Sequence, residues 1–455
     1  MSLCSGRDAH GVLCAGIRLP AQRTRGPGVK RRLVRFSRRL WSAAVAVTIL
    51  EFAGPAVCHA QARLTVQEAV DTALRSRALL KADAERVTAA EGRKRQAGLM
   101  PNPEFQFGNE NLRPGQTYSR DVDILAYVTW PLDVLGKRGQ RVAVAEQVVS
   151  RIEAEIELTR RQVSHTVRLA YWAARGAQER RDLLQSTVAN FQRIIDYHAA
   201  QLSAGTIAEQ DLLRVRLEGE RIQIAVHLAT IDAAKARVQL LKDMGQAAGS
   251  EVVLTEPLEA MPASLAATSG MSTIEDALAR RSEIKVATAS IEEARANTRL
   301  QDITARPDLA VVYGYKRTQL PDALSGVNTS LAAVKVTIPL LDRNQGNRAA
   351  AAAELRRQEQ LGTETEASIR ADLQRAAQEY EMRRAEVVET LRPLREHATT
   401  LSNIAQAAYR QGGVELLRLL DAERSRLDAE AAWVDGMVAF QQSVVNLEAA
   451  QGVTR

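Results

Sequence analysis

An internal duplication constrains the fold of this chain more than any other feature of its sequence. The stretch "PLDVLGKRGQR" begins at Pro131, and "PLLDRNQGNR" begins 208 residues later, at Pro339. Each stretch follows a segment of alternating apolar and polar residues. Each also precedes a long run rich in Ala, Glu and Arg. Two copies of one structural unit explain this pattern, so the fold must be one that a repeat can build.

Further landmarks recur in the same order. The segments that begin at Ala73 and Ala277 match with an offset of 204 residues, and Gly205 and Gly412 are 207 residues apart. Matches that keep their order along the chain indicate duplication. The predicted units are an N-terminal segment (1–60), a first repeat (61–246), a linker rich in Gly, Pro and small residues (247–270), a second repeat (271–450) and a short tail (451–455).

The net charge of +7 belongs to the N-terminal segment and not to the repeats. Residues 1–60 carry ten Lys or Arg and two Asp or Glu, so the remaining chain is close to neutral. A body without a basic excess argues against a nucleic-acid partner. The basic "VKRRLVRFSRRL", the apolar "WSAAVAVTIL" and the final "CHA" predict an export signal cleaved after Ala60.

The apolar run of this signal is shorter than the roughly 18–20 residues of a transmembrane helix, so an anchor is the weaker alternative. Cys4, Cys14 and Cys58 are the three cysteines of the sequence. All of them precede the expected cleavage site, so the mature chain has neither disulfides nor thiolate metal ligands.

Each repeat is expected to begin with a helix of about 30 residues, at roughly 65–99 and 272–304. An extended pair, a very long helix, a glycine turn and a second long helix follow. Alternation in Asp121–Trp130 and Asn328–Ile338 predicts strands with one apolar face. Their lengths match the roughly 9–11 residues of a tilted membrane-spanning strand. Amphipathic hairpins on a soluble core are the alternative.

The long helices are expected to pack as coiled coils, because apolar residues recur at intervals of three and four. The first predicted seam contains Leu184, Val188, Phe191, Ile195, His198 and Leu202. The second contains Leu213, Leu217, Ile224, Leu228 and Ile231. Gly205 lies between the two runs, and Gly412-Gly413 takes the same place in the second repeat. Glycine allows the left-handed conformation that ends many helices.

Two hairpins supply four strands, which cannot close a barrel. An open strand edge in lipid leaves backbone groups unpaired, at a cost of several kcal/mol each. Three chains would supply about twelve strands, more than the eight of the smallest barrels. Spanning strands therefore favour a cyclic homo-oligomer.

"PNPEF", "PLDVLGKRGQR", "PLLDRNQGNRAAAAAEL" and "GGVELLRLLDAERSRL" resemble landmarks of the outer-membrane efflux protein family, the TolC-like channel-tunnels. "LGKRGQR" with "DRNQGN" is most similar to the cobalt–zinc–cadmium heavy-metal efflux branch. The resemblance implies a mainly α fold with a small transmembrane β part. It also implies a homotrimer whose 12-stranded β-barrel lies in the outer membrane of a Gram-negative bacterium and continues as an α-helical barrel into the periplasm.

The resemblance also implies roles for single residues and partners. Asp421 falls at an acidic ring of the pore gate, where Arg418 replaces a second acid, and Asp211 falls at a tip acid whose usual partner position is Val414. The turns expected to meet a periplasmic adaptor (a membrane fusion protein) contain Gly205, Thr206, Gly412 and Gly413. An inner-membrane, proton-driven pump would supply the energy.

The duplicated stretches then become barrel–tunnel junctions. In each copy a proline is expected to end a strand, where no ladder N–H is needed, and a polar glycine-containing stretch turns the chain into the tunnel helix. The expected junction residues are Pro131, Gly139, Arg141, Pro339, Gly346 and Arg348.

No motif points to an enzyme, a cofactor or a resident metal. The four histidines after residue 60 (His165, His198, His227 and His397) form no ligand cluster, and "GKRGQR" lacks the spacing of a phosphate-binding loop. The function expected is a passive outer-membrane duct for heavy-metal cations. The alternatives are a multidrug duct of the same family, a periplasmic coiled-coil adaptor and a soluble coiled-coil scaffold.

Overall fold

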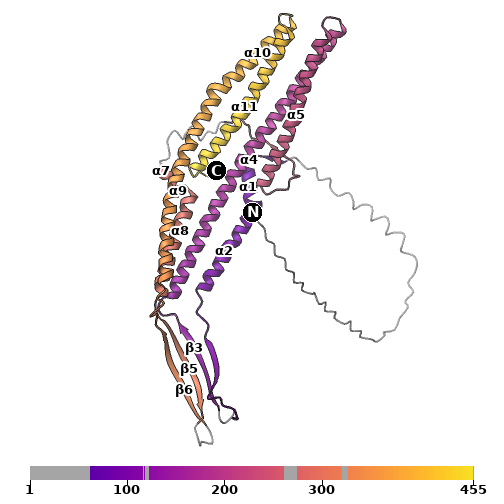
Figure 1. Ribbon diagram of the computed structural model, residues 1–455. Coiled ribbons are helices and arrows are strands. Elements are labelled where there is room, and N and C mark those ends of the chain that lie inside the picture. Colours follow the sequence, from indigo (N-terminus) through magenta and orange to yellow (C-terminus); the bar gives the residue numbers. More distant parts are fainter. Residues whose placement is uncertain (1–61, 116, 118–121, 261–273, 320–325, 454–455) are drawn as a thin grey trace, which may run out of the picture. The chain divides into compact units, whose positions relative to one another are not determined.

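The computed structural model describes residues 62–115, 117, 122–260, 274–319 and 326–453 (Figure 1). The predicted signal segment with its three cysteines lies outside the described residues, as does the end of the predicted linker. The described part is mainly helical, as expected.

The elements follow the same order in both repeats, with α9, η1 and α10 of the second repeat in the place of α4 of the first. The first repeat comprises α1 (Val66–Ser76), α2 (Ala78–Ala97), β2 (Glu104–Glu110), β3 (Asp123–Leu132), α4 (Lys137–Ser203) and α5 (Glu209–Asp243). The second comprises α7 (Ile274–Arg280), α8 (Ser282–Thr304), β5 (Asp308–Thr318), β6 (Val327–Thr337), α9 (Gln345–Ala385), the π-helical turn η1 (Glu386–Leu391), α10 (Arg392–Arg410) and α11 (Leu416–Ala450). The strands lie at one end of the long helices and the glycine turns at the other (Figure 1).

The single first helix predicted for each repeat is wrong, because an extended residue divides it. Arg77 separates α1 from α2, and Arg281, 204 residues later, separates α7 from α8. Each break lies beside the C-terminal end of a long helix, α5 in the first repeat and α11 in the second. Ser76 donates a hydrogen bond to Met244 O at 2.7 Å, and Arg281 Nη1 donates to Ala449 O at 3.0 Å. No glycine or proline adjoins either position, so the helix breaks are determined by these tertiary contacts.

The four long strands form one antiparallel sheet in the order β2-β3-β5-β6. The two hairpins share one register, since Glu104 pairs with Thr129 and Asp308 pairs with Thr337. The second pair differs from the first by 204 and 208 residues. These are the offsets read from the sequence, so the sheet repeats the duplication residue by residue.

The prediction that proline ends each strand is wrong for the first repeat. Pro131 lies within β3 and pairs with Ala310 of β5. The β2–β3 ladder stops at Thr129, so Pro131 has no β2 residue opposite it that would require an N–H donor. Pro339 does follow the end of β6 at Thr337.

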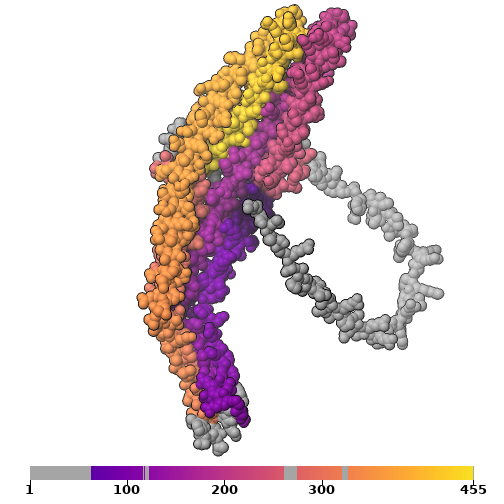
Figure 2. Space-filling view, viewed as in Figure 1, coloured from indigo at the N-terminus to yellow at the C-terminus, as the bar shows by residue number. Residues whose placement is uncertain are grey.

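The helix α4 runs for 67 residues and packs against both α5 and α11. The two helical hairpins therefore lie side by side along α4 and α11 (Figure 2). Tyr171 of α4 and Phe440 and Met437 of α11 are among the most buried side chains of the core. Gly176 allows this close approach, and Gly436 allows α11 to approach η1. A Cβ atom at Gly176 would clash with Val438, and one at Gly436 would clash with Leu391.

The predicted coiled-coil seam is correct on α4 and wrong on α5. Leu184 and Phe191 are buried as expected. Their partners on α5 are Ile222, Val226 and Ala229, which belong to another stripe of that helix. The predicted α5 residues Leu213, Leu217, Ile224, Leu228 and Ile231 are exposed. Two apolar stripes run along α5, and the spacing alone does not say which one faces α4.

Part of the predicted linker is bound to the helices. Strand β4 (Val252–Leu254) pairs in parallel with β1 (Ala62–Leu64). The buried Tyr171 hydroxyl donates to Leu64 O at 2.8 Å, and Gln441 Nε2 donates to Leu258 O at 3.0 Å. The linker therefore joins the N-terminal strand to the core of both hairpins.

We predict that Gly176→Ala destabilises the fold by about 1–3 kcal/mol, because the added methyl group overpacks the α4–α11 contact. Gly92→Ala on α2 is the control, since a Cβ there has no neighbour within 4 Å and helix propensity favours Ala. Thermal unfolding followed by circular dichroism measures both. An unchanged midpoint for Gly176→Ala would contradict the close packing of α4 on α11.

Candidate functional site

The two turns that join the long helices, called the tips below, have the same backbone structure. Gly205 has φ 70° and Gly412 has φ 73°. Thr206 N–H donates to Gln201 O at 3.0 Å, and Gly413 N–H donates to Ala408 O at 2.8 Å. These bonds, with the left-handed glycine, form the Schellman motif that closes a helix C-terminus. The predicted turn residues thus end α4 and α10 and are exposed to solvent.

The predicted charged residues follow the tips in the first two turns of the next helices. Asp211 is half-buried on α5, while Arg418 and Asp421 are exposed on α11. Within the described chain no ion pair joins these three side chains. The 207-residue offset makes Asp211 equivalent to Arg418 and Arg214 equivalent to Asp421. The two repeats therefore carry opposite charges at the same distance from their tips.

A buried histidine lies behind the tips, in a contact that the sequence did not predict. His198 of α4 is fully buried and stacks on Tyr409 of α10, with ring centroids 5.5 Å apart. His198 Nδ1 lies 2.7 Å from Ile194 O, so that nitrogen carries the proton. His198 Nε2 then accepts from the Tyr409 hydroxyl, also at 2.7 Å. The spacing of apolar residues places His198 on a coiled-coil seam, which predicts its burial but not its partner.

Tyr409 lies close enough to the predicted gate residue Asp211 for the two side chains to interact electrostatically. Burial raises the pKa of the Tyr409 phenol, and the nearby Tyr197 hydroxyl and Asp211 carboxylate raise it further. Tyr409 therefore stays protonated at physiological pH and remains a donor to His198. A second polar contact holds α10 to α11, because buried Glu423 accepts from Ser402 Oγ at 2.6 Å.

The predicted junction residues of the first repeat surround a helix start. Gly136, with φ 81°, makes the turn into α4, whereas Gly139 already lies in the first helical turn. Asp133 accepts from Arg138 N–H at 3.2 Å and from Arg141 Nη2 at 3.0 Å. Arg141 thus fixes the carboxylate that satisfies an otherwise unpaired amide of the helix N-terminus.

In the second repeat the equivalent turn is made without glycine. Asn344, 208 residues after Gly136, has φ 58°, and Gly346 lies within α9. Asn344 Nδ2 donates to Gln301 O at 2.9 Å, and Arg348 Nε donates to Asp302 at 2.7 Å. Asparagine tolerates the left-handed conformation, so this second turn needs no glycine, while the predicted junction residues Gly139 and Gly346 lie in the first turns of α4 and α9.

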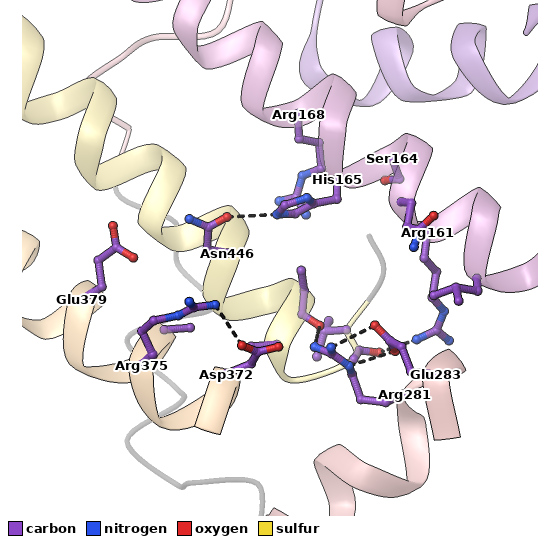
Figure 3. Close-up of a pocket in the computed structure, with 17 residues that line it drawn as sticks. Arg161, Ser164, His165, Arg168, Arg281, Glu283, Asp372, Arg375, Glu379 and Asn446 are labelled. Atoms are coloured by element: carbon purple, nitrogen blue, oxygen red, sulfur yellow. Dashed lines mark hydrogen bonds and ion pairs between the residues drawn. The ribbon is translucent and has the colours of Figure 1, made fainter. Parts of the chain in front are cut away.

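A cavity of about 460 Å³ lies between α4, α9 and the end of α11 (Figure 3). Four arginines line it, and each has an acidic or carbonyl partner. Arg281 binds Glu283 at 2.9 Å, and Arg375 binds Asp372 at 2.8 Å. Arg161 donates to Gly452 O at 3.3 Å and Arg168 binds Glu448. These guanidinium groups neutralise acids and the C-terminal end of α11, so the cavity is built for structure rather than for an anion.

Among the described residues, no group of three or more His, Cys, Asp or Glu side chains is arranged to hold a metal ion. No helix in that part of the chain is both long enough and apolar enough to cross a membrane.

We predict that Tyr409→Phe destabilises the tip region by about 1–3 kcal/mol, because it leaves the buried His198 Nε2 without a donor. Tyr197→Phe is the matched control, since Tyr197 is partly exposed and, among the described residues, its hydroxyl accepts a hydrogen bond from Gln201 on its own helix. Hydrogen exchange of the α10 amides reports the effect. Equal exchange in the two variants would rule out the buried bond as a support of the tip.

A family model described as "Outer membrane efflux protein" matches residues 69–246 and 273–453. The cobalt-zinc-cadmium resistance protein CzcC of Cupriavidus metallidurans is 24% identical to the chain over 385 residues. That match covers 85% of this chain and 89% of CzcC.

Solved structures share the fold. The chain is similar to CusC, with a TM-score of 0.69 and 18% identity over 86% of this chain and 92% of CusC. It is also similar to the MtrE outer membrane channel of Neisseria gonorrhoeae, with a TM-score of 0.69 and 18% identity over 85% and 89% of the two chains. The family match spans both repeats, and it agrees with the resemblance in the sequence motifs. The chain belongs to the outer membrane efflux protein family.

Proposed function

We propose that the chain is the outer-membrane channel of a tripartite efflux pump, a passive duct that works as a homotrimer. The observation that carries this proposal is that a single copy is incomplete on two sides. Its sheet has two open edges, and its two outermost long helices expose apolar stripes.

The open sheet edges are β2 and β6. The β6 residues are exposed along the whole strand, and Phe105 and Phe107 of β2 are exposed as well. Long apolar strand edges invite pairing with another chain. Three copies would bring twelve strands together, and closing them into a barrel removes every edge, as lipid requires.

The helical edges give the same indication. The exposed stripe of α5 includes Leu228 and Ile231, whose equivalents on α11, 207 residues later, are Asp435 and Val438. On α11 these positions face α4, where Asp435 binds Arg180 at 2.7 Å. By the same geometry α5 would pack against the α9–α10 helix of the next copy. Leu394, Leu401 and Ile404 of α10 are exposed and available.

A ring that repeats this contact closes on itself and surrounds a pore. In this proposal the 12-stranded barrel lies in the outer membrane of a Gram-negative bacterium, and the helices extend into the periplasm. Gly205, Thr206, Gly412 and Gly413 meet the periplasmic adaptor, and Asp421, Arg418 and Asp211 line the gate. The junction residues Pro131, Gly139, Arg141, Pro339, Gly346 and Arg348 lie where barrel meets tunnel. An inner-membrane, proton-driven pump supplies the energy.

The substrate we propose is a heavy-metal cation. Support comes from the similarity to a cobalt-zinc-cadmium resistance protein over most of both chains. A duct needs no tight ligand set, because an ion must bind weakly enough to leave. A strain that lacks the gene should become sensitive to these cations. Sensitivity to organic antibiotics alone would favour the multidrug alternative.

The purified protein should form ion-conducting pores in planar bilayers, and Asp421→Ala should raise their conductance by removing a charged gate side chain. Asp428→Ala, on the same helix two turns further from the tip, is the matched control. Recovery of the native protein in the soluble periplasmic fraction without detergent would contradict the proposed function as an outer-membrane duct. Unchanged conductance with Asp421→Ala would remove that residue from the gate.

Bulky charges at the tips should block adaptor docking. Gly205→Glu and Gly412→Glu place a long anionic side chain at an exposed left-handed position, which is strained for glutamate. Adaptor pull-down should fall for both variants. Gly249→Glu is the control, since it lies in an exposed turn at the other end of α5. Normal pull-down by both tip variants would contradict docking at the tips.

A further inference from the structure

We propose that strand β6 of one copy pairs with strand β2 of the next copy in a defined register, with Leu340 opposite Phe105 and Ile338 opposite Phe107 of the neighbouring copy. The proposal rests on the proposed ring of copies and goes beyond it, because it names the residues that meet.

The duplication supplies a template for this contact within the chain. β2 is equivalent to β5, and β3 is equivalent to β6, as their shared hairpin register demonstrates. The β3–β5 ladder joins the first repeat to the second. By analogy, β6 would join the second repeat of one copy to β2 in the first repeat of the next copy. In β3–β5, Leu132 is opposite Leu309 and Trp130 is opposite Val311.

Applying the two offsets fixes the register. Leu132 and Trp130 become Leu340 and Ile338 when 208 residues are added. Leu309 and Val311 become Phe105 and Phe107 when 204 are subtracted.

The end of β6 supports this step. β3 continues for three residues beyond its ladder with β2, and those residues pair only with β5. The equivalent residues 338–340 have no strand partner in the described chain. They lie past the end of β6 because the strand that would pair with them belongs to another copy.

The exposed side chains fit this register. Phe105 is 70% exposed, Phe107 55%, Ile338 63% and Leu340 70%. All four would lie on one face of the joined sheet, beside the apolar face formed by Val128, Trp130 and Leu132. A slip by one residue would place the phenylalanines on the face of Lys335 and Thr337 instead.

Charge and polarity at both ends of the ladder agree. Lys335 falls opposite Glu110 of the neighbouring copy, a favourable cross-strand pair. At the junction, Lys137 binds Asp308 at 2.8 Å in the chain. The equivalent residues are Gln345 and Glu104 of the neighbour, which can form a hydrogen bond.

Cysteine crosslinking tests the register on a clean background, since no cysteine follows Cys58. The double variant Leu340→Cys/Phe105→Cys, in membranes, is oxidised with copper phenanthroline or bridged with a short bis-thiol reagent. Directly opposite strand residues have Cβ atoms about 4.5–5.5 Å apart, within reach of such bridges. We expect covalent dimers and trimers on non-reducing gels, and neither single-cysteine variant should give them.

The chain provides its own standards. Leu132→Cys/Leu309→Cys should crosslink within one copy and leave the mass of a monomer, because this pair is the internal equivalent. Leu340→Cys/Gln106→Cys and Leu340→Cys/Phe107→Cys represent slips of one and two residues and should crosslink far less.

Three outcomes separate the ideas. Preferential crosslinking of the predicted pair supports the register. Stronger crosslinking of a slipped pair, or none in a variant that still conducts as wild type in bilayers, overturns the register and leaves the duct standing. If the unmodified protein neither conducts ions nor forms oligomers, both the proposed function and the register are overturned.

Discussion

The unpaired backbone along β2 and β6 is the constraint on which the rest of this molecule depends. A four-stranded sheet has two edges, and each edge carries a row of N–H and C=O groups that need partners. The helices at the other end are also incomplete, because the apolar stripes of α5 and α10 remain exposed. In the proposed homotrimer, the same neighbouring copy would complete both the sheet and the helical layer.

The interior of a single copy is, in contrast, well specified. Glycines at positions 176 and 436 bring α11 close to α4 and η1, and the linker strand β4 is bound through β1 and Tyr171. The tips are closed by Schellman motifs and supported by the His198–Tyr409 bond. A copy with a closely packed interior and unpaired edges is suited to form the wall of the assembly that we propose.

The order of elements, the strand faces and the glycine turns could be predicted from the sequence, because each follows from a local pattern that occurs twice. The family was predicted from the resemblance of several motifs to its landmarks. Positions decided by tertiary contact were not predictable. Arg77 and Arg281 break helices without a local breaker, and α5 has two apolar stripes of which spacing cannot choose one. Asn344 replaces a glycine at a left-handed turn. Tyr409 was missed because its partner His198 is 211 residues away along the chain.

The exchanged charges near the tips have a consequence for symmetry. A ring of six identical hairpins would carry the same side chain six times at each level, so any acid would face only acids. A chain that contains both hairpins escapes this restriction. Asp211 and Arg418 occupy equivalent positions with opposite sign, and so do Arg214 and Asp421. In the homotrimer that we propose, duplication followed by divergence would alternate the charges around the axis, an arrangement that no assembly of a single repeat could reach.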